Sequence, residues 1–200
     1  MTALPVGVTT HKIAGKKLSI LYPSITGPQS FSQQKINADI LKNVQNQIRF
    51  GGYDGGVKTD MQGTYELKTN ERDLLSLTLL NYVYSGGAHG MSYLKGLTYD
   101  TKTGRKYKLQ DLFKKDSNYT ERLSSIIDEQ LKEREITLLD PPFKSIRPDQ
   151  DFYLADKSLV LYFQLYEIAA YAYGFLYFPL SIYDLQDIIN PDGPLPRLYG

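Results

Sequence analysis

Residues 64–99, TYELKTNERDLLSLTLLNYVYSGGAHGMSYLKGLTY, decide the fold class of this chain. Three runs within this stretch are rich in Leu, Tyr, Thr and Val, which favour strands: 64–68, 74–84 and 93–99. The connections between them are short and polar or glycine-rich, as is typical of neighbouring antiparallel strands. The stretch therefore predicts an antiparallel meander.

The middle run carries large apolar side chains on both faces. Successive side chains of a strand point to opposite faces, so one face holds Leu75, Leu77 and Leu79. The other face holds Leu80, Tyr82 and Tyr84. We therefore expect this strand to be buried on both sides. A polar turn at 100–104 then leads into a further predicted strand at 106–109.

Two amphipathic helices are predicted outside the meander. Ile and Val recur at helical spacing from Ile36 to Ile48 after Ser30 and Gln33, a capping-box pattern, which predicts a helix over residues 30–50. Leu and Ile recur in the same way from Leu123 to Leu131, and Asp116 or Ser117 is the expected N-cap.

The remaining segments complete the expected fold. Strands are predicted at 11–25, 152–154, 158–163 and 175–179, and a short helix at 181–185. The proline-rich end of the chain, from Pro191, has no periodicity, so we expect it to be extended or loosely attached. The fold class is therefore α+β, with antiparallel sheets on which the two main helices pack. We expect a small companion lobe at residues 1–58 and a second domain at 59–200.

Composition excludes several classes of function. The 23 Lys and Arg residues nearly balance 22 Asp and Glu, so the chain has no large excess of positive charge for nucleic-acid phosphates. The absence of Cys excludes disulfides, thiolate metal sites and cysteine nucleophiles. Residues 168–180 are too few to span a bilayer, and residues 1–8 lack the pattern of a secretory signal. We expect either a cytoplasmic protein or a chain whose leader or anchor has been removed.

The glycine-rich run 85–90 is the sharpest local feature. Ser85, Gly86, Gly87 and His89 lie in it, and its glycines allow a tight turn with exposed amide groups. It matches neither a Walker loop nor a nucleophile elbow, so it does not predict phosphate binding or hydrolysis. His89 is open to three interpretations: a ring that bonds its own turn or a carboxylate, a ligand contact, or a metal ligand.

A second candidate site is the aromatic run at 162–174. It contains a single acid, Glu167, among neighbours that include Tyr166 and Tyr171. If Glu167 is partly buried it needs a partner, and Arg, Lys or His89 can supply one. The pair is either structural or places an acid in a binding groove. We expect the acids at 149 and 151 to be solvated loop residues.

Four blocks of this sequence resemble one family. They are YSGGAHG (84–90), LTYDTKTGRKYKLQDLF (97–113), FYLADKSLVLYFQLYEIAAYAYG (152–174) and FPL (178–180). In this order they are similar to the extracytoplasmic domain of RsiV-type anti-sigma factors, which also accompanies the catalytic domain of PdaC-type peptidoglycan deacetylases. The helix start INADI (36–40) is similar to the small companion domain that precedes it.

The resemblance implies a fold, an extracytoplasmic location and a binding role near the cell wall. RsiV-type domains bind lysozyme, and PdaC-type enzymes keep their metal-dependent chemistry in a separate domain. We therefore expect a non-catalytic envelope domain without cofactor or metal that binds a lysozyme-like protein or a wall glycan. Ser85, Gly86, Gly87, His89, Tyr166, Glu167 and Tyr171 are the expected ligand-binding residues. The alternatives are a wall hydrolase or deacetylase-associated enzyme domain that uses His89 with Glu167, and an oligomerising structural module.

Overall fold

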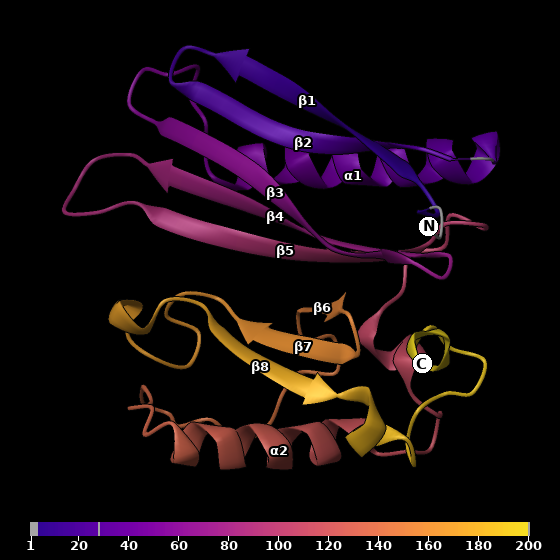
Figure 1. Cartoon of the computed structure of the whole chain (residues 1–200). Helices are drawn as coiled ribbons and strands as arrows, with labels where there is room; N and C mark the ends of the chain where they lie inside the picture. The colour runs from indigo at the N-terminus through magenta and orange to yellow at the C-terminus, as the bar shows by residue number, and fades with distance from the viewer. Residues whose placement is uncertain (1–3, 28, 200) are drawn as a thin grey trace. The chain divides into compact units, whose positions relative to one another are not determined.

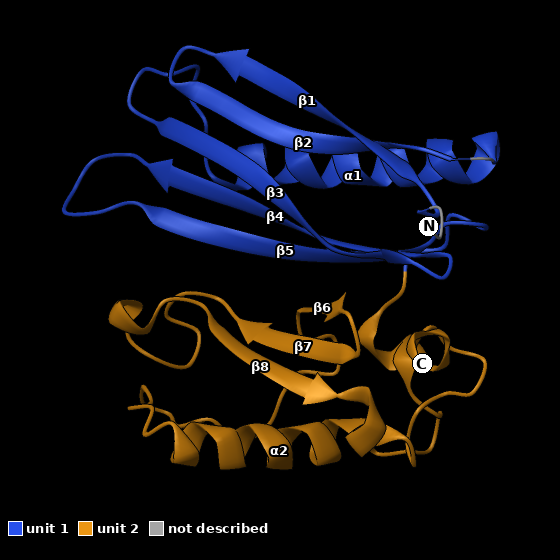
Figure 2. Cartoon of the chain, in the orientation of Figure 1, with its two compact units in different colours: residues 1–106 blue, residues 107–200 orange. Residues whose placement is uncertain are grey.

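The computed structural model describes residues 4–27 and 29–199. The first three residues, part of the segment in which no secretory signal was found, lie outside the described residues. The chain divides into two compact units, Met1–Lys106 and Tyr107–Gly200 (Figure 2). Within the described ranges, no helix combines the length and the apolar character needed to cross a membrane.

Unit 1 is a five-stranded sheet with one long helix (Figure 1). Its elements are β1 (Gly7–Gly15), β2 (Leu18–Thr26), α1 (Ser30–Phe50), β3 (Asp60–Glu71), β4 (Leu74–Tyr84) and β5 (Met91–Asp100). The strands lie in chain order and pair antiparallel, except that β2 and β3 are parallel. A parallel pair needs a long crossover, and α1 supplies it.

The core of unit 1 lies between α1 and one face of the sheet. Ile36, Ile40 and Val44 form the buried stripe of the helix, as their spacing predicts, and pack with the leucines at 75, 77 and 79 of β4. The predicted capping box does not form. The N-cap is Gln29, and the Gln33 side chain instead accepts a hydrogen bond from the Gly27 amide at 3.1 Å.

The predicted meander corresponds to β3, β4 and β5. Arg72 and Asp73 form a two-residue turn with φ values of 49° and 60°, so β3 runs further than predicted. The expectation that β4 is buried on both sides is wrong at its end, because Tyr82 and Tyr84 are each 37% exposed. The expected strand at 106–109 is also wrong. Only a single bridge, Tyr99 to Lys106, forms there before a short 3-10 helix begins.

Unit 2 is a three-stranded antiparallel sheet with a second helix (Figure 1). Its main elements are α2 (Tyr119–Glu133), β6 (Phe152–Ala155), β7 (Ser158–Phe163) and β8 (Leu176–Ser181). The predicted apolar stripe of α2 is buried, but its N-cap is Asn118 in a left-handed conformation, not Asp116 or Ser117. The predicted short helix is the 3-10 turn Ile182–Leu185.

Side chains from the end of α2 cover the outer edge of β8. Gln130 donates to the carbonyl oxygen of Pro179 at 3.4 Å, and Arg134 donates to that of Tyr177 at 2.9 Å. The Arg134 guanidinium also lies 5.1 Å from the centre of the Phe178 ring. These contacts hold the helix against the strand and occupy two backbone acceptors of the edge.

The C-terminal tail is packed, so the expectation of loose attachment is wrong. Its last turn, Leu195–Leu198, is a 3-10 helix whose two leucines are buried. The Asn190 amide donates to the Leu112 carbonyl oxygen at 2.9 Å, and Arg197 donates to the Tyr107 hydroxyl at 3.3 Å. Proline supports this turn, because it fixes φ in the helical range.

The observed fold class is α+β, as predicted. The compact units divide at residues 106 and 107, later than the domain boundary expected after residue 58, because β3 pairs with β2 and joins the first unit. We propose the boundary after residue 58 as a boundary between evolutionary domains, because a compact unit of the structure need not coincide with an evolutionary domain.

The buried tail leads to a stability prediction. Leu195→Ala removes a fully buried side chain, so we expect it to lower the free energy of unfolding by about 2–4 kcal/mol. Leu139→Ala is the matched control, because Leu139 is 37% exposed, and its effect should be below about 1 kcal/mol. Urea denaturation of the full chain measures both. Equal effects would contradict a packed tail.

Candidate functional site

The glycine loop, residues 85–90, joins β4 to β5 in unit 1 and is exposed from Ser85 to His89. Gly86 and Gly87 have φ values of 99° and 97°, and a Cβ atom at either would meet nothing within 4 Å. The Tyr84 hydroxyl donates to the Gly87 carbonyl oxygen at 3.0 Å. The loop therefore has a defined shape and an open surface.

His89 contacts the backbone of its own turn. Its Nδ1 lies 2.8 Å from the Gly90 carbonyl oxygen, while the residue as a whole is exposed. This geometry agrees with the interpretation of a ring that bonds its own loop. In the part of the chain that the structure describes, no three His, Cys, Asp or Glu residues lie together as a metal site.

Tyr82 and Tyr84 project beside the glycine loop from the sheet face opposite α1, and sequence reasoning did not include them in the site. The Tyr82 ring lies against Gly90, where a Cβ atom would come within 2.3 Å of it. Only glycine leaves room for the ring there. Tyr82 also borders a shallow groove of about 340 Å³, whose lining includes Leu21, Gln62 and Leu80. Tyr82 and Tyr84 together form an exposed aromatic surface beside the glycine loop.

The loop between α1 and β3 supports the glycine loop through Thr59. The Thr59 hydroxyl donates to the Gly52 carbonyl oxygen at 3.2 Å and lies 3.3 Å from the Ser85 hydroxyl. Asp54 shapes this support, because its carboxylate accepts the amides of Val57, Lys58 and Thr59 at 3.0, 2.8 and 3.2 Å. These amides, that of Lys58 foremost, lower the pKa of Asp54 below its ordinary value.

The lowered pKa of Asp54 predicts a pH-dependent contribution to stability. The charged carboxylate stabilises the loop above its unfolded-state pKa, near 3.8, and this contribution is lost as pH falls through the lower folded-state value. We expect Asp54→Asn to lower the melting temperature at neutral pH and to leave it almost unchanged well below pH 3.8. Melting curves of both proteins across this range measure the difference. A difference that persists in acid would contradict the role of the charge.

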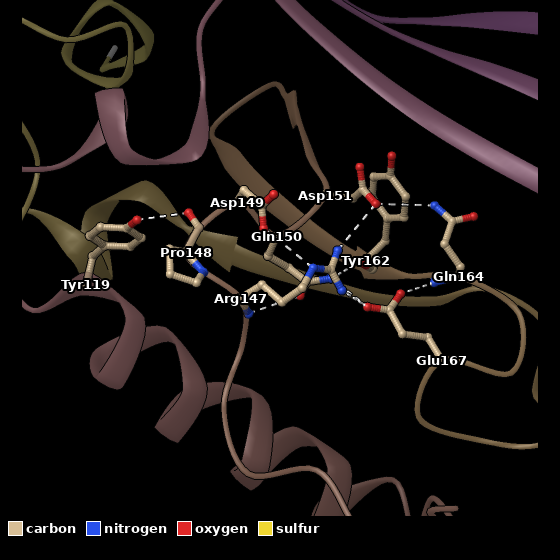
Figure 3. Close-up of polar contacts among 9 residues, drawn as sticks. All are labelled: Tyr119, Arg147, Pro148, Asp149, Gln150, Asp151, Tyr162, Gln164 and Glu167. Carbon is tan, nitrogen blue, oxygen red and sulfur yellow. Dashed lines mark hydrogen bonds and ion pairs between the residues drawn. The ribbon is translucent and has the colours of Figure 1, made fainter. Parts of the chain in front are cut away.

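In unit 2, Glu167 is held by an arginine and by the backbone (Figure 3). Its Oε1 accepts a hydrogen bond from Arg147, and its Oε2 accepts the Gln164 amide at 2.6 Å. The buried Gln150 side chain donates to the Tyr162 carbonyl oxygen at 2.8 Å and approaches Glu167 Oε1 at 3.5 Å. Glu167 therefore has the charged partner that its surroundings required, and that partner is Arg147.

Arg147 bridges three acids, as Figure 3 shows. Besides Glu167, it lies 3.7 Å from Asp151 and 3.5 Å from Asp149. Partial burial alone lowers the pKa of Arg147, but the hydrogen bond and charge of Glu167, with the charges of Asp151 and Asp149, raise it on balance. The prediction of two solvated acids holds for Asp149, 89% exposed, and is wrong for Asp151, 15% exposed.

The tyrosines next to Glu167 lie on an irregular loop. Tyr166 has a φ of 63° and is 46% exposed, and its ring centre lies 5.6 Å from that of Tyr171. Tyr173, 39% exposed, accepts the Thr137 amide through its hydroxyl at 3.1 Å, and this hydrogen bond lowers its pKa. The Arg147–Glu167 pair fixes the start of the loop that presents these rings.

The expected site residues therefore form two local sites, one in each unit. Ser85, Gly86, Gly87 and His89 belong to unit 1, and Tyr166, Glu167 and Tyr171 belong to unit 2. Sequence reasoning missed Arg147 because one sequence does not reveal which distant cation pairs with Glu167, although its position among acids in RPDQD (147–151) is a usable signal.

Comparison with known proteins identifies the relatives of both units. The family described as "Protein of unknown function (DUF3298)" matches residues 110–183, and the family described as "Deacetylase PdaC" matches residues 14–92. The anti-sigma-V factor RsiV of Bacillus subtilis (strain 168) is 34% identical over 118 residues, which cover 52% of this chain and 40% of that protein. The chain contains a DUF3298 domain of the RsiV and PdaC type.

The peptidoglycan-N-acetylmuramic acid deacetylase PdaC, also of B. subtilis, is 25% identical over 119 residues, 56% of this chain and 26% of that protein. The chain thus spans less than half the length of either relative. Crystal structures of DUF3298 proteins from Bacteroides fragilis and Pseudomonas aeruginosa share the fold of this chain. The B. fragilis structure has a TM-score of 0.70 at 15% identity, and the match covers 98% of this chain and 97% of that one. The P. aeruginosa structure has a TM-score of 0.66 at 17% identity, and the match covers 99% of this chain and 97% of that one.

The geometry of the Glu167 site predicts energetic coupling. In a double-mutant cycle of Arg147→Met and Glu167→Gln, we expect a coupling energy of about 1 kcal/mol, because a partly buried ion pair joins the two residues. Asp149→Asn, at a highly exposed position, should change stability by less than about 0.5 kcal/mol. Urea denaturation of the four proteins of the cycle and the control measures these values. Simple additivity would show that the pair does not stabilise the domain.

Proposed function

We propose that this chain is a non-catalytic, extracytoplasmic binding domain of the bacterial cell envelope. A lysozyme-like protein is its first candidate partner, and a wall glycan is its second. The relatives support the envelope location, since one is named as a peptidoglycan deacetylase and the other as an anti-sigma factor. The choice of lysozyme follows from the resemblance to RsiV-type domains. Because the chain matches only part of each relative, their activities are not carried over.

The exposed surface around the glycine loop carries this proposal. Tyr82 and Tyr84 present large rings beside a loop whose glycines leave open space, and aromatic rings with a polar end are enriched in recognition surfaces. The hydrogen bond from Tyr84 to the loop and the contact of Tyr82 with Gly90 hold this surface in shape before a partner arrives. Such preorganisation lowers the entropy cost of binding.

The exposed Tyr166 and the half-buried Tyr171 of unit 2 are proposed as a further contact. Glu167 positions their loop in this proposal and does not serve as a catalytic base, since both of its oxygens already accept hydrogen bonds within the domain. A general base needs an oxygen within reach of the proton that it removes. This engagement of Glu167 supports the non-catalytic reading over a hydrolase that uses His89 with Glu167.

Titration calorimetry with a purified lysozyme tests the first partner. We expect binding by the unaltered chain, and we expect Tyr82→Ala or His89→Ala to weaken it by about tenfold or more, as for residues central to an interface. Matched controls are Tyr183→Ala, at a tyrosine 45% exposed in unit 2, and His11→Ala, at an exposed histidine of β1 that contacts Ser24. The controls should bind like the unaltered chain.

Soluble muropeptides, fragments of the wall glycan, form the second arm of the same experiment. Heat with muropeptides alone would assign the glycan as the partner. Absence of heat with both ligands, or equal loss in the test and control variants, would contradict recognition through this surface. Hydrolysis of the muropeptides that His89→Ala abolishes would instead support the enzyme alternative.

A further inference from the structure

The near-zero net charge of the chain conceals two oppositely charged units. Unit 1 has 13 Lys and Arg residues against 7 Asp and Glu, whereas unit 2 has 10 against 15. The first 38 residues contain no Asp or Glu at all. Unit 1 is therefore a cationic body, which the balanced composition of the whole chain did not reveal.

Three lysines of unit 1 gather at one end of its sheet. Lys16 and Lys17 form the β1–β2 turn, and Lys58 lies in the loop between α1 and β3. Figure 1 shows this turn and this loop at the same end of the sheet. We call these three residues the cationic end. All three are exposed, and none has an acidic partner within 4 Å among the residues that the structure describes.

Backbone contacts bring the two segments together. The Tyr53 hydroxyl donates to the Lys16 carbonyl oxygen at 2.7 Å, and the Met61 amide donates to that of Lys17 at 2.8 Å. Gly56 lies so close to the turn that a Cβ atom would be 2.1 Å from the Lys16 carbonyl oxygen. Lys58 is thus held near Lys16 and Lys17 by contacts on both sides of it in the chain.

The acids at this end do not pair with the three lysines. Asp54 turns its carboxylate onto the amides of its own loop, and one of these amides belongs to Lys58. Asp60 is half-buried at the start of β3. Three lysines on adjoining segments without paired acids give this end a positive potential, which attracts a polyanion. Scattered exposed lysines are common on protein surfaces. Here the close approach of Gly56 to the Lys16 carbonyl fixes the two segments that carry the lysines, so the surface has a defined shape.

We propose that the cationic end binds a polyanionic polymer with repeating phosphodiesters, of the kind exposed in a bacterial envelope. A polymer fits better than a small anion, because the three lysines are exposed and a chain of phosphates can contact all of them at once. Its affinity should fall steeply as salt rises, since the contacts are screened in water. This proposal does not depend on the partner of the glycine loop, and either can fail alone.

Poly(glycerol phosphate) of defined length is the probe, and uncharged dextran is the negative control. We expect the unaltered chain to bind the polymer at low salt and to release it as salt rises. The triple variant Lys16→Glu, Lys17→Glu, Lys58→Glu should bind the polymer at least about tenfold more weakly, because three exposed charge contacts are lost. Fluorescence anisotropy of labelled polymer measures the affinities.

The matched control has the same net charge as the test variant. Lys42→Glu, Lys115→Glu, Lys144→Glu changes three exposed lysines for which the structure gives no ion pair, and it should keep most of the affinity. Equal losses in both triple variants would overturn the proposal, as would failure of the unaltered chain to bind the polymer. Stronger binding to vesicles of phosphatidylglycerol than to the polymer would also overturn it. If the test variant does not fold, the triple Lys→Gln variant takes its place.

Discussion

The parallel pairing of β2 with β3 is the constraint on which the architecture of unit 1 depends. A parallel pair cannot be closed by a tight turn, so α1 must run the length of the sheet and the chain must return before β3 begins. The returning loop, residues 51–59, meets both the β1–β2 turn and the glycine loop through Tyr53 and Thr59. One topological requirement thus brings three loops to a single end of the sheet.

Unit 2 presents aromatic residues on an irregular segment. The loop after β7 contains Tyr166 in a left-handed conformation, which is costly for a bulky residue unless its surroundings hold it. Arg147, Gln150 and the Gln164 amide hold Glu167, the next residue in the chain. The charged pair is therefore best understood as a support for the neighbouring rings.

Periodic features of this protein could be predicted from its sequence, and features that depend on distant partners could not. The apolar stripes of both helices and the strands of the meander follow from local spacing, and the structure has them. The burial of the tail depends on contacts such as Asn190 with Leu112, between residues far apart in the chain. The partner of Glu167 and the exposure of Tyr82 depend in the same way on tertiary neighbours. For this reason, the glycine loop could be found from the sequence, but the aromatic residues beside it could not be assigned to the site.

The cover that Gln130 and Arg134 place over β8 has a consequence for behaviour at high concentration. A sheet edge normally offers a row of free backbone acceptors to any passing strand, and such edges are where aggregates begin. On β8, two of these acceptors are already occupied, and Pro179 has no amide hydrogen to offer in return. An incoming strand would have to displace a helix side chain for each bond it made, so this border of the domain resists uncontrolled polymerisation.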